Sequence, residues 1–383
     1  MKIDLNAGEY RKFQRIIEII DMNSEVVEMY SNFLINQPCF ITKELVEEIQ
    51  TSCEVSEEYA YFVLFAAACG LDMDKNKKEL EIAMSYFIPS IKQLETKTYM
   101  ENSYYKNITI PEVKCGDWEL KYESYQSYEA FIYNDLMVDK DFREIPRLGF
   151  FNEELLFPAV LESDVEWMTI TPNEIETMQP VVDEVEGSVI TFGLGLGYFA
   201  YMVSEKEQVQ GITVVEKNEE VIRLFQNYIL PQFPHKDKVE IIRMDAFEYV
   251  GKHMGNKNYD YAFVDLWHDV SDGVDLYLKM NKLEYLHPNT KFNYWIEESL
   301  LSNLRWCVYT ALLDGMNTEN IIDYAQVGEK TDACADNKES YQQEFEQKIR
   351  AVSSYLEVKN INTFDEITYY LSDSFLKILA KAI

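Results

Sequence analysis

Residues 188–216, SVITFGLGLGYFAYMVSEKEQVQGITVVE, contain the pattern that decides the fold. Residues 189–192 are β-branched or aromatic, which is typical of a short strand buried on both faces. Gly193, Gly195 and Gly197, the turn glycines, follow at once. Because glycine adopts positive φ and has no Cβ, such a turn lets a ligand approach the backbone closely before a helix begins. The stretch predicts a strand, a glycine turn and a helix.

Carboxylates follow the predicted strands of this region. A helix over 198–205 and a strand over 211–215 come next, and Glu216 ends that strand. Two further predicted strands, over residues 239–243 and 261–264, are followed by Asp245 and Asp265. Since the carboxyl ends of parallel strands meet at one edge of a sheet, the three acids are expected along one ligand-binding edge.

The segment from about residue 171 to 313 resembles the class I S-adenosylmethionine-dependent methyltransferases. The resemblance implies a Rossmann-like, doubly wound and mostly parallel α/β sheet, S-adenosylmethionine as cofactor, and methyl transfer to a small molecule or a protein. Its motifs specify a cofactor class and not a substrate. They are FGLGLG (192–197), VVEKN (214–218), RMDAF (243–247), YDYAFVDLW (259–267) and LHPNTKFNYWIE (286–297).

The resemblance also implies roles for individual residues. Glu216 would hold the ribose and Asp245 the adenine amino group, with the backbone N–H of Ala246 facing the ring. The family usually has an acid two residues before the first glycine, whereas this chain has Thr191, so the usual contact to the amino-acid end of the cofactor lacks its acid. The implied cofactor-binding set is Gly193, Gly195, Gly197, Glu216, Asp245, Ala246 and Asp265.

The loop DLWHDVSDG (265–273) is the densest polar group in the chain. In the resembled family this loop faces the reactive methyl group. Methyl transfer requires an aligned acceptor and a group that receives a proton, and Asp265, His268 and Asp269 are the candidate catalytic residues. The alternative interpretation is that the acids of this loop cap the helix that follows.

Four parts are expected along the chain. A bundle of amphipathic helices precedes a small antiparallel β unit, whose strands are expected over 107–113, 118–122 and 128–133. The Rossmann-like domain follows, and then a helical extension in which the family's strands six and seven are absent or disguised, for example near 324–327. The expected boundaries are 1–105, 106–170, 171–315 and 316–383.

The entry to the Rossmann-like domain has two further signals. Residues 171–174, TPNE, have the pattern of a capping box with proline at the first helical position, and Thr363 with Glu366 repeats the pattern near the end of the chain. Trp167 and Met168 lie just before the first pattern, where they are candidates for a pocket wall or for ordinary core packing.

Composition restricts the partners. The chain has 67 acidic and 35 basic residues and a formal charge of −32, which argues against a nucleic-acid partner and favours a neutral or cationic substrate. The same charge would also keep a protein soluble. The longest apolar run, residues 59–71, is too short to span a bilayer, and the N-terminus lacks the pattern of a signal peptide.

The cysteines and the remaining features add three expectations. Six widely spaced cysteines without a Cys-x-x-Cys pair predict reduced thiols, no metal site and a cytoplasmic location. No membrane partner is expected, and a homo-oligomer stays open. The N-terminal helices fit a lid, a substrate-recognition unit or a dimerisation surface equally well.

Three other functions stay open beside methyl transfer. A spermidine-synthase-like aminopropyltransferase has the same fold and the same order of a small β unit before the parallel sheet, but its glycine motif normally contains an Asp. A nicotinamide-dependent enzyme fits the G-x-G-x-x-A pattern at 195–200 but leaves Asp245 and Asp265 unexplained. A non-catalytic descendant that keeps the pocket is the third.

Overall fold

The computed structural model describes residues 2–163, 165–316 and 335–383. Its central feature is a five-stranded sheet of order β11-β10-β9-β12-β13, in which all neighbouring strands run parallel. The middle strand is the one that leads into the glycine turn, so the turn lies where the chain order reverses and where open sheets bind ligands. The predicted strands are confirmed as β9 (Gly187–Phe192), β10 (Val209–Glu216), β11 (Val239–Arg243) and β12 (Tyr261–Val264), followed by β13 (Lys291–Tyr294).

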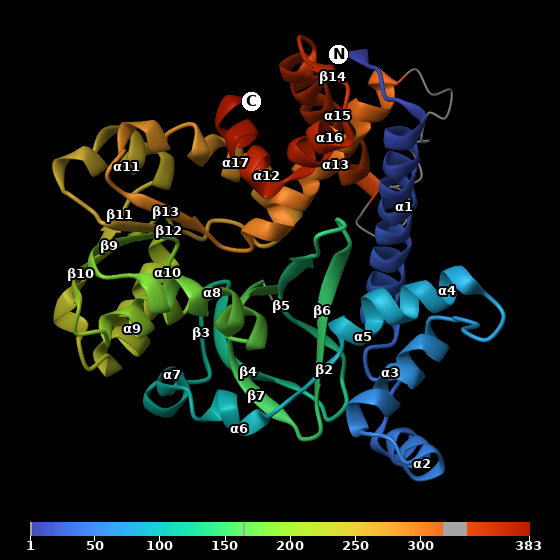
Figure 1. The fold of residues 1–383 in the computed structure, drawn as a ribbon. Coiled ribbons are helices and arrows are strands. Elements are labelled where there is room, and N and C mark those ends of the chain that lie inside the picture. The colour runs from blue at the N-terminus through green and yellow to red at the C-terminus, as the bar shows by residue number, and fades with distance from the viewer. Residues whose placement is uncertain (1, 164, 317–334) are drawn as a thin grey trace.

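A helix lies in every connection between these strands. Parallel strands that alternate with helices form a mixed α/β, Rossmann-like fold, which is seen at the left of Figure 1. The core is buried between sheet and helices, with the middle of β9 fully inaccessible to solvent. The connecting helices are α9 (Tyr198–Ser204), α10 (Glu219–Leu224), α11 (Ala246–Lys252) and α12 (Val270–Asn281). Helix α8 (Pro172–Glu184) precedes the first strand of the sheet, and α13 (Glu297–Gly315) follows the last.

Two smaller sheets precede the parallel sheet, where one small β unit is expected. The first has the order β2-β6-β5 and the second the order β3-β4-β7-β8. The strand predicted over 107–113 is wrong, because the chain there ends a short helix, α7 (Ser103–Asn107), and starts a strand only at Val113. The strands are β2 (Lys92–Leu94), β3 (Val113–Cys115), β4 (Trp118–Tyr125), β5 (Phe131–Val138), β6 (Glu144–Phe151), β7 (Leu155–Glu162) and β8 (Val165–Thr169).

The N-terminal part is helical, as predicted, and its first helix, α1, has 30 residues, Ala7–Asn36. Asn23 in the middle of α1 is buried, and its side chain accepts hydrogen bonds from the Tyr86 hydroxyl (2.7 Å) and the Glu144 backbone N–H (3.1 Å). The following elements are α2 (Lys43–Cys53), α3 (Glu57–Ala68), α4 (Lys77–Ile82), a π-helical turn (Ala83–Phe87), α5 (Ile88–Ser90) and α6 (Thr96–Met100).

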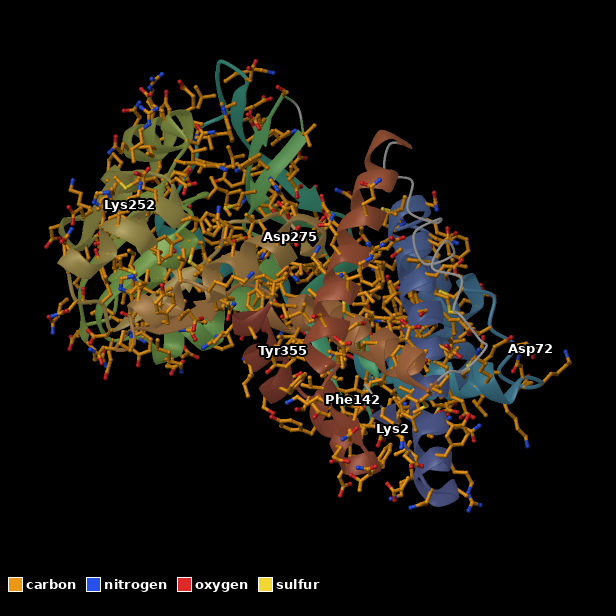
Figure 2. The ribbon with its side chains drawn as sticks, turned by 90° about the horizontal axis from the view of Figure 1, so that it is seen from above. Lys2, Asp72, Phe142, Lys252, Asp275 and Tyr355 are labelled. Carbon is orange, nitrogen blue, oxygen red and sulfur yellow. The ribbon has the colours of Figure 1, made fainter. Side chains whose placement is uncertain are left out.

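The two ends of the chain meet. Strand β1 (Lys2–Ile3) pairs in parallel with β14 (Asn360–Ile361). Figure 2 shows Lys252 and Asp72 at opposite ends of the molecule, with Tyr355 of the C-terminal helices between them. These helices are α15 (Ala335–Leu356), α16 (Phe364–Leu371), which begins with the predicted Thr363 capping box, and α17 (Asp373–Ala382).

Two further expectations concern additional strands of the parallel sheet and membrane-spanning helices. The strand suggested near 324–327 lies outside the described residues, and within them no strand extends the parallel sheet beyond β13. No helix in the described ranges is long and apolar enough to cross a membrane.

Candidate functional site

Gly193 packs the turn against the end of β12. Its φ is +101°, and its backbone N–H donates to the Val215 carbonyl oxygen at 3.0 Å. A Cβ atom at this position would lie 1.9 Å from the Asp265 carbonyl oxygen. Only glycine therefore allows the turn to approach the loop after β12.

Gly195 and Gly197 serve close packing in this structure. A Cβ at Gly195 would lie 1.6 Å from the Met168 sulfur, and one at Gly197 would lie 2.2 Å from the Phe225 ring. The space above Gly195, which the sequence reserves for a ligand, is filled by the Met168 side chain. Of the two candidates for a pocket wall, Met168 therefore lies against the turn.

Trp167 lies beside the loop that follows β12. Its ring is edge-on to the His268 ring, with centroids 4.4 Å apart, and to the Trp118 ring, with centroids 5.3 Å apart. The small β unit thus contacts the candidate catalytic loop through this side chain.

The segment around α7 holds the outer side of the glycine turn. The Tyr104 hydroxyl donates to the Leu196 carbonyl oxygen at 2.7 Å, and the Asn107 amide donates to the Tyr201 hydroxyl at 2.7 Å. Tyr104 is fully buried. These contacts fix the turn from a part of the chain that precedes it by about ninety residues.

A small cavity lies between the turn, β8, β12 and the start of α8. Its volume is about 20 Å³, which is room for about one water molecule. It contains no basic side chain among the residues that line it. Its polar lining consists of Thr169, Glu174, Thr191, Tyr198 and Asp265.

Glu174 is the residue of this site that the sequence missed. Its side chain lines the cavity, it is only 9% exposed, and it has no hydrogen-bond partner among the described residues. The predicted capping box is wrong here: α8 begins after Thr171 as expected, but no side-chain cap bond forms. Burial, and then the nearby Asp265 charge, raises the pKa of Glu174 well above its usual range.

Asp265 closes β12 and faces the same cavity. Its backbone N–H donates to the Phe192 carbonyl oxygen at 2.9 Å, and its carboxylate has no hydrogen-bond partner in the described part of the chain. Burial, with the Glu216 charge as the second cause, raises the pKa of Asp265 to about 7. Two carboxyl groups without partners therefore share one cavity.

Glu216 is bound to the glycine turn itself. Its carboxylate accepts hydrogen bonds from the Leu194 N–H at 3.2 Å and from the Asn218 N–H at 2.7 Å. A carboxylate has about four acceptor positions, so capacity for a ligand hydroxyl remains. The structure brings Glu216 to the turn, as the sequence predicts.

Asp245 and Ala246 lie at the end of the neighbouring strand, farther from the cavity. Asp245 is exposed, and its side chain caps α11 by accepting from the Glu248 N–H at 3.0 Å. Ala246 begins that helix and is buried. The Met244 N–H donates to the Glu216 carbonyl oxygen at 3.0 Å, so Asp245 follows directly after a residue that is paired with the end of β10.

The loop after Asp265 caps a helix, as the alternative interpretation predicts. Asp269 is the N-cap of α12 and forms a capping box with Asp272. The exposed His268 ring places Nδ1 3.0 Å from an Asp272 carboxylate oxygen. Of the candidate catalytic residues, Asp265 lines the cavity, whereas His268 and Asp269 do not.

Comparisons with known proteins identify no family for this chain. No family model matches this sequence, and no curated protein matches it. Among solved structures, the spermidine synthase from Thermotoga maritima aligns with 18% identity and a TM-score of 0.24 over 32% of this chain and 45% of that chain. This chain therefore spans less than half of that protein.

His, Cys, Asp and Glu side chains are the potential metal ligands of the chain. Within residues 2–163, 165–316 and 335–383, no three His, Cys, Asp or Glu side chains gather as they would around a metal ion. Cys39, Cys53, Cys69 and Cys307 are free thiols.

Proposed function

We propose that the chain binds S-adenosylmethionine at the carboxyl edge of the parallel sheet and transfers its methyl group to an acceptor. One observation carries the proposal: the cavity beside the glycine turn is lined by two carboxyl groups without partners, Glu174 and Asp265, and by no basic side chain. A ligand with positive charge suits such a site, because a cation stabilises carboxylates that are removed from water.

Charge also separates the candidate cofactors. A nicotinamide dinucleotide would bring its anionic pyrophosphate to the glycine turn, where Glu174, Asp265 and Glu216 would repel it. S-adenosylmethionine carries a sulfonium and an ammonium group and only one carboxylate. The acidic cavity therefore favours the sulfonium cofactor over NAD.

The chemistry of the lining fits the cofactor, and its volume does not fit without movement. About 20 Å³ is far below the few hundred Å³ that a cofactor needs. Met168 fills the space above Gly195, and its flexible side chain is the group that must move. Glu216 would then bind the ribose of the cofactor, and Asp245 and Ala246 would contact its adenine base.

The acceptor side of the reaction is assigned to the loop after β12. Asp265 would face the transferred group and accept a proton, since a pKa near 7 lets a carboxyl group take up and release protons near neutral pH. His268 lies at the surface of the same loop beside Trp167 and would contact the acceptor. When bound, the cofactor supplies the electrophilic carbon, and the protein supplies alignment and proton acceptance.

Aminopropyl transfer is the second candidate, because the same two carboxyl groups favour it. The decarboxylated cofactor lacks the carboxylate and carries more net positive charge. A cavity with Glu174 and Asp265 and no base would therefore attract it at least as strongly as S-adenosylmethionine.

A calorimetric titration tests the proposal. S-adenosylmethionine or its decarboxylated form should bind and NAD should not, and Glu216→Ala should weaken binding at least about tenfold through the loss of charged hydrogen bonds. Glu240→Ala, which removes an exposed carboxylate paired with Lys257, is the control. Binding of NAD alone, or equal affinity in both variants and the wild type, would contradict the assignment.

A further inference from the structure

We propose that Glu174, on α8, replaces the acid that is missing at Thr191 and binds the ammonium group at the amino-acid end of the cofactor. This inference rests on the proposed function and names a ligand contact within it. It assigns to the start of α8 a role that the resembled motif places at the end of β9.

Glu174 and Thr191 line the same cavity. Thr191 lies two residues before Gly193, the first glycine of the turn. It is 3% exposed and lines the cavity on the side of β9, whereas Glu174 lines it from α8. The hydroxyl of Thr191 cannot neutralise a cation. An acid on the facing helix can, and it reaches the cavity from the other wall.

Leaving the Glu174 carboxyl group without a partner costs free energy. A buried polar group without a hydrogen bond costs about 1–3 kcal/mol, and a charged group costs more. Glu174 is more than nine-tenths buried, yet among the described residues no donor reaches its carboxylate. Native proteins rarely leave such a group without a partner, so a donor in the cavity, from a ligand or an ordered water, is expected beside Glu174.

The neighbours of Glu174 make the site selective for cations. Asp265 faces it across the cavity, and Glu166 of β8 lies near enough to act on it electrostatically. Burial, and then these acids, raise the pKa of Glu174, and a bound cation would favour its ionised form. Ligand binding should thus be accompanied by proton release.

Glu176 provides a matched comparison on the same helix. It lies two residues further along α8, and its carboxylate accepts a hydrogen bond from the Tyr99 hydroxyl at 2.9 Å. Glu176 therefore has a partner and does not line the cavity. Substitution of the two residues separates the contribution of the cavity from that of helix charge.

The experiment compares two adenosine ligands and two variants of the full chain by calorimetry. The ligands are S-adenosylmethionine and 5′-methylthioadenosine, which has the adenosine thioether but no amino-acid end. Glu174→Gln should weaken S-adenosylmethionine at least about tenfold and change methylthioadenosine less than about twofold, since only one ligand carries the ammonium group. Glu176→Gln should leave both affinities unchanged.

Three results would overturn the inference, and they are distinguishable. If Glu174→Gln weakens both ligands equally, the residue does not recognise the amino-acid end, and if it weakens neither, the contact does not exist. If the wild-type chain binds neither ligand, the proposed function itself fails. Thermal unfolding of each variant, which should match or exceed that of the wild type, shows that lost affinity is not lost folding.

Discussion

Two groups of ionisable side chains inside this molecule differ in whether the described chain supplies their hydrogen-bond partners. Arg305 of α13 is 2% exposed and donates hydrogen bonds to Glu144 of β6 (2.7 Å), Asp373 of α17 (2.5 Å) and the Leu371 carbonyl oxygen (3.0 Å). Glu174 and Asp265 at the glycine turn have no partner in the described chain.

The comparison distinguishes charges that hold the fold together from charges that await a ligand. Arg305 joins the small β unit to two C-terminal helices, and residues of the chain itself accept its hydrogen bonds. The cavity carboxyl groups lower the folding stability of the free protein, because no group in the described chain compensates for their removal from water. We infer that the cavity is kept for binding and the Arg305 group for structure.

The largest effect is expected from Arg305→Met. The substitution leaves Glu144, which is 3% exposed, buried without its cation, and breaking such a pair costs about 3–5 kcal/mol. Urea denaturation measures the change in unfolding free energy. Arg350→Met removes an exposed i,i+4 pair with Glu346 and should cost less than about 0.5 kcal/mol, and equal effects would contradict the comparison.

A smaller loss is expected from Gly193→Ala at the cavity. The new Cβ would collide with the Asp265 carbonyl oxygen and hold alanine at a strained positive φ, so the cost should be about 2–4 kcal/mol. Gly251→Ala in α11 is the control, because nothing lies within 4 Å of its Cβ position and alanine favours helix by about 0.5–1 kcal/mol. Thermal unfolding that places both variants together would refute the packing account of the turn.

The pH dependence of stability sharpens the comparison further. The raised pKa values of Glu174 and Asp265 mean that the folded protein holds protons that the unfolded chain releases. The favourable contribution of Asp265 is complete below about pH 4 and is lost as the pH rises through about 7, its folded pKa, and that of Glu174 is lost as the pH rises through its own raised pKa. Glu174→Gln should therefore match the wild type at pH 4 and exceed its stability by about 1–2 kcal/mol at pH 8.

Urea denaturation at the two pH values measures this difference, with Glu176→Gln as the control. Parallel pH profiles for the wild type and Glu174→Gln would show that Glu174 is not destabilised by burial.

The sequence predicts the parallel sheet well because its signals are local. Strands β9, β10 and β12 contain short apolar runs, and Glu216 and Asp265 stand at the ends of two of these strands by simple counting along the chain. The glycine turn is equally visible. The position of these residues at one edge follows from strand direction alone.

The features that the sequence misses depend on tertiary contacts or on interrupted patterns. Strands β6 and β7 contain Pro146 and Pro158, which weaken a strand pattern, although both prolines lie within the small sheets. Burial of Asn23 in α1 is matched by a hydrogen bond from Tyr86, 63 residues away, which no local pattern indicates. Glu174 fits a local helix-capping pattern, so nothing nearby in the sequence signals that its carboxylate faces a cavity.

Proton release on ligand binding tests the central claim most directly. The wild-type chain is titrated with S-adenosylmethionine by calorimetry at about pH 6.5, a pH at which the ligand amino group is already protonated. The titration is made in two buffers of different protonation enthalpy, so that the difference in heat reports the number of protons released. A cation that meets Glu174 and Asp265 should ionise at least one of them, so the account predicts binding with release of about one to two protons. Binding without proton release, or no binding, would contradict the claim that these carboxyl groups exist for a cationic ligand.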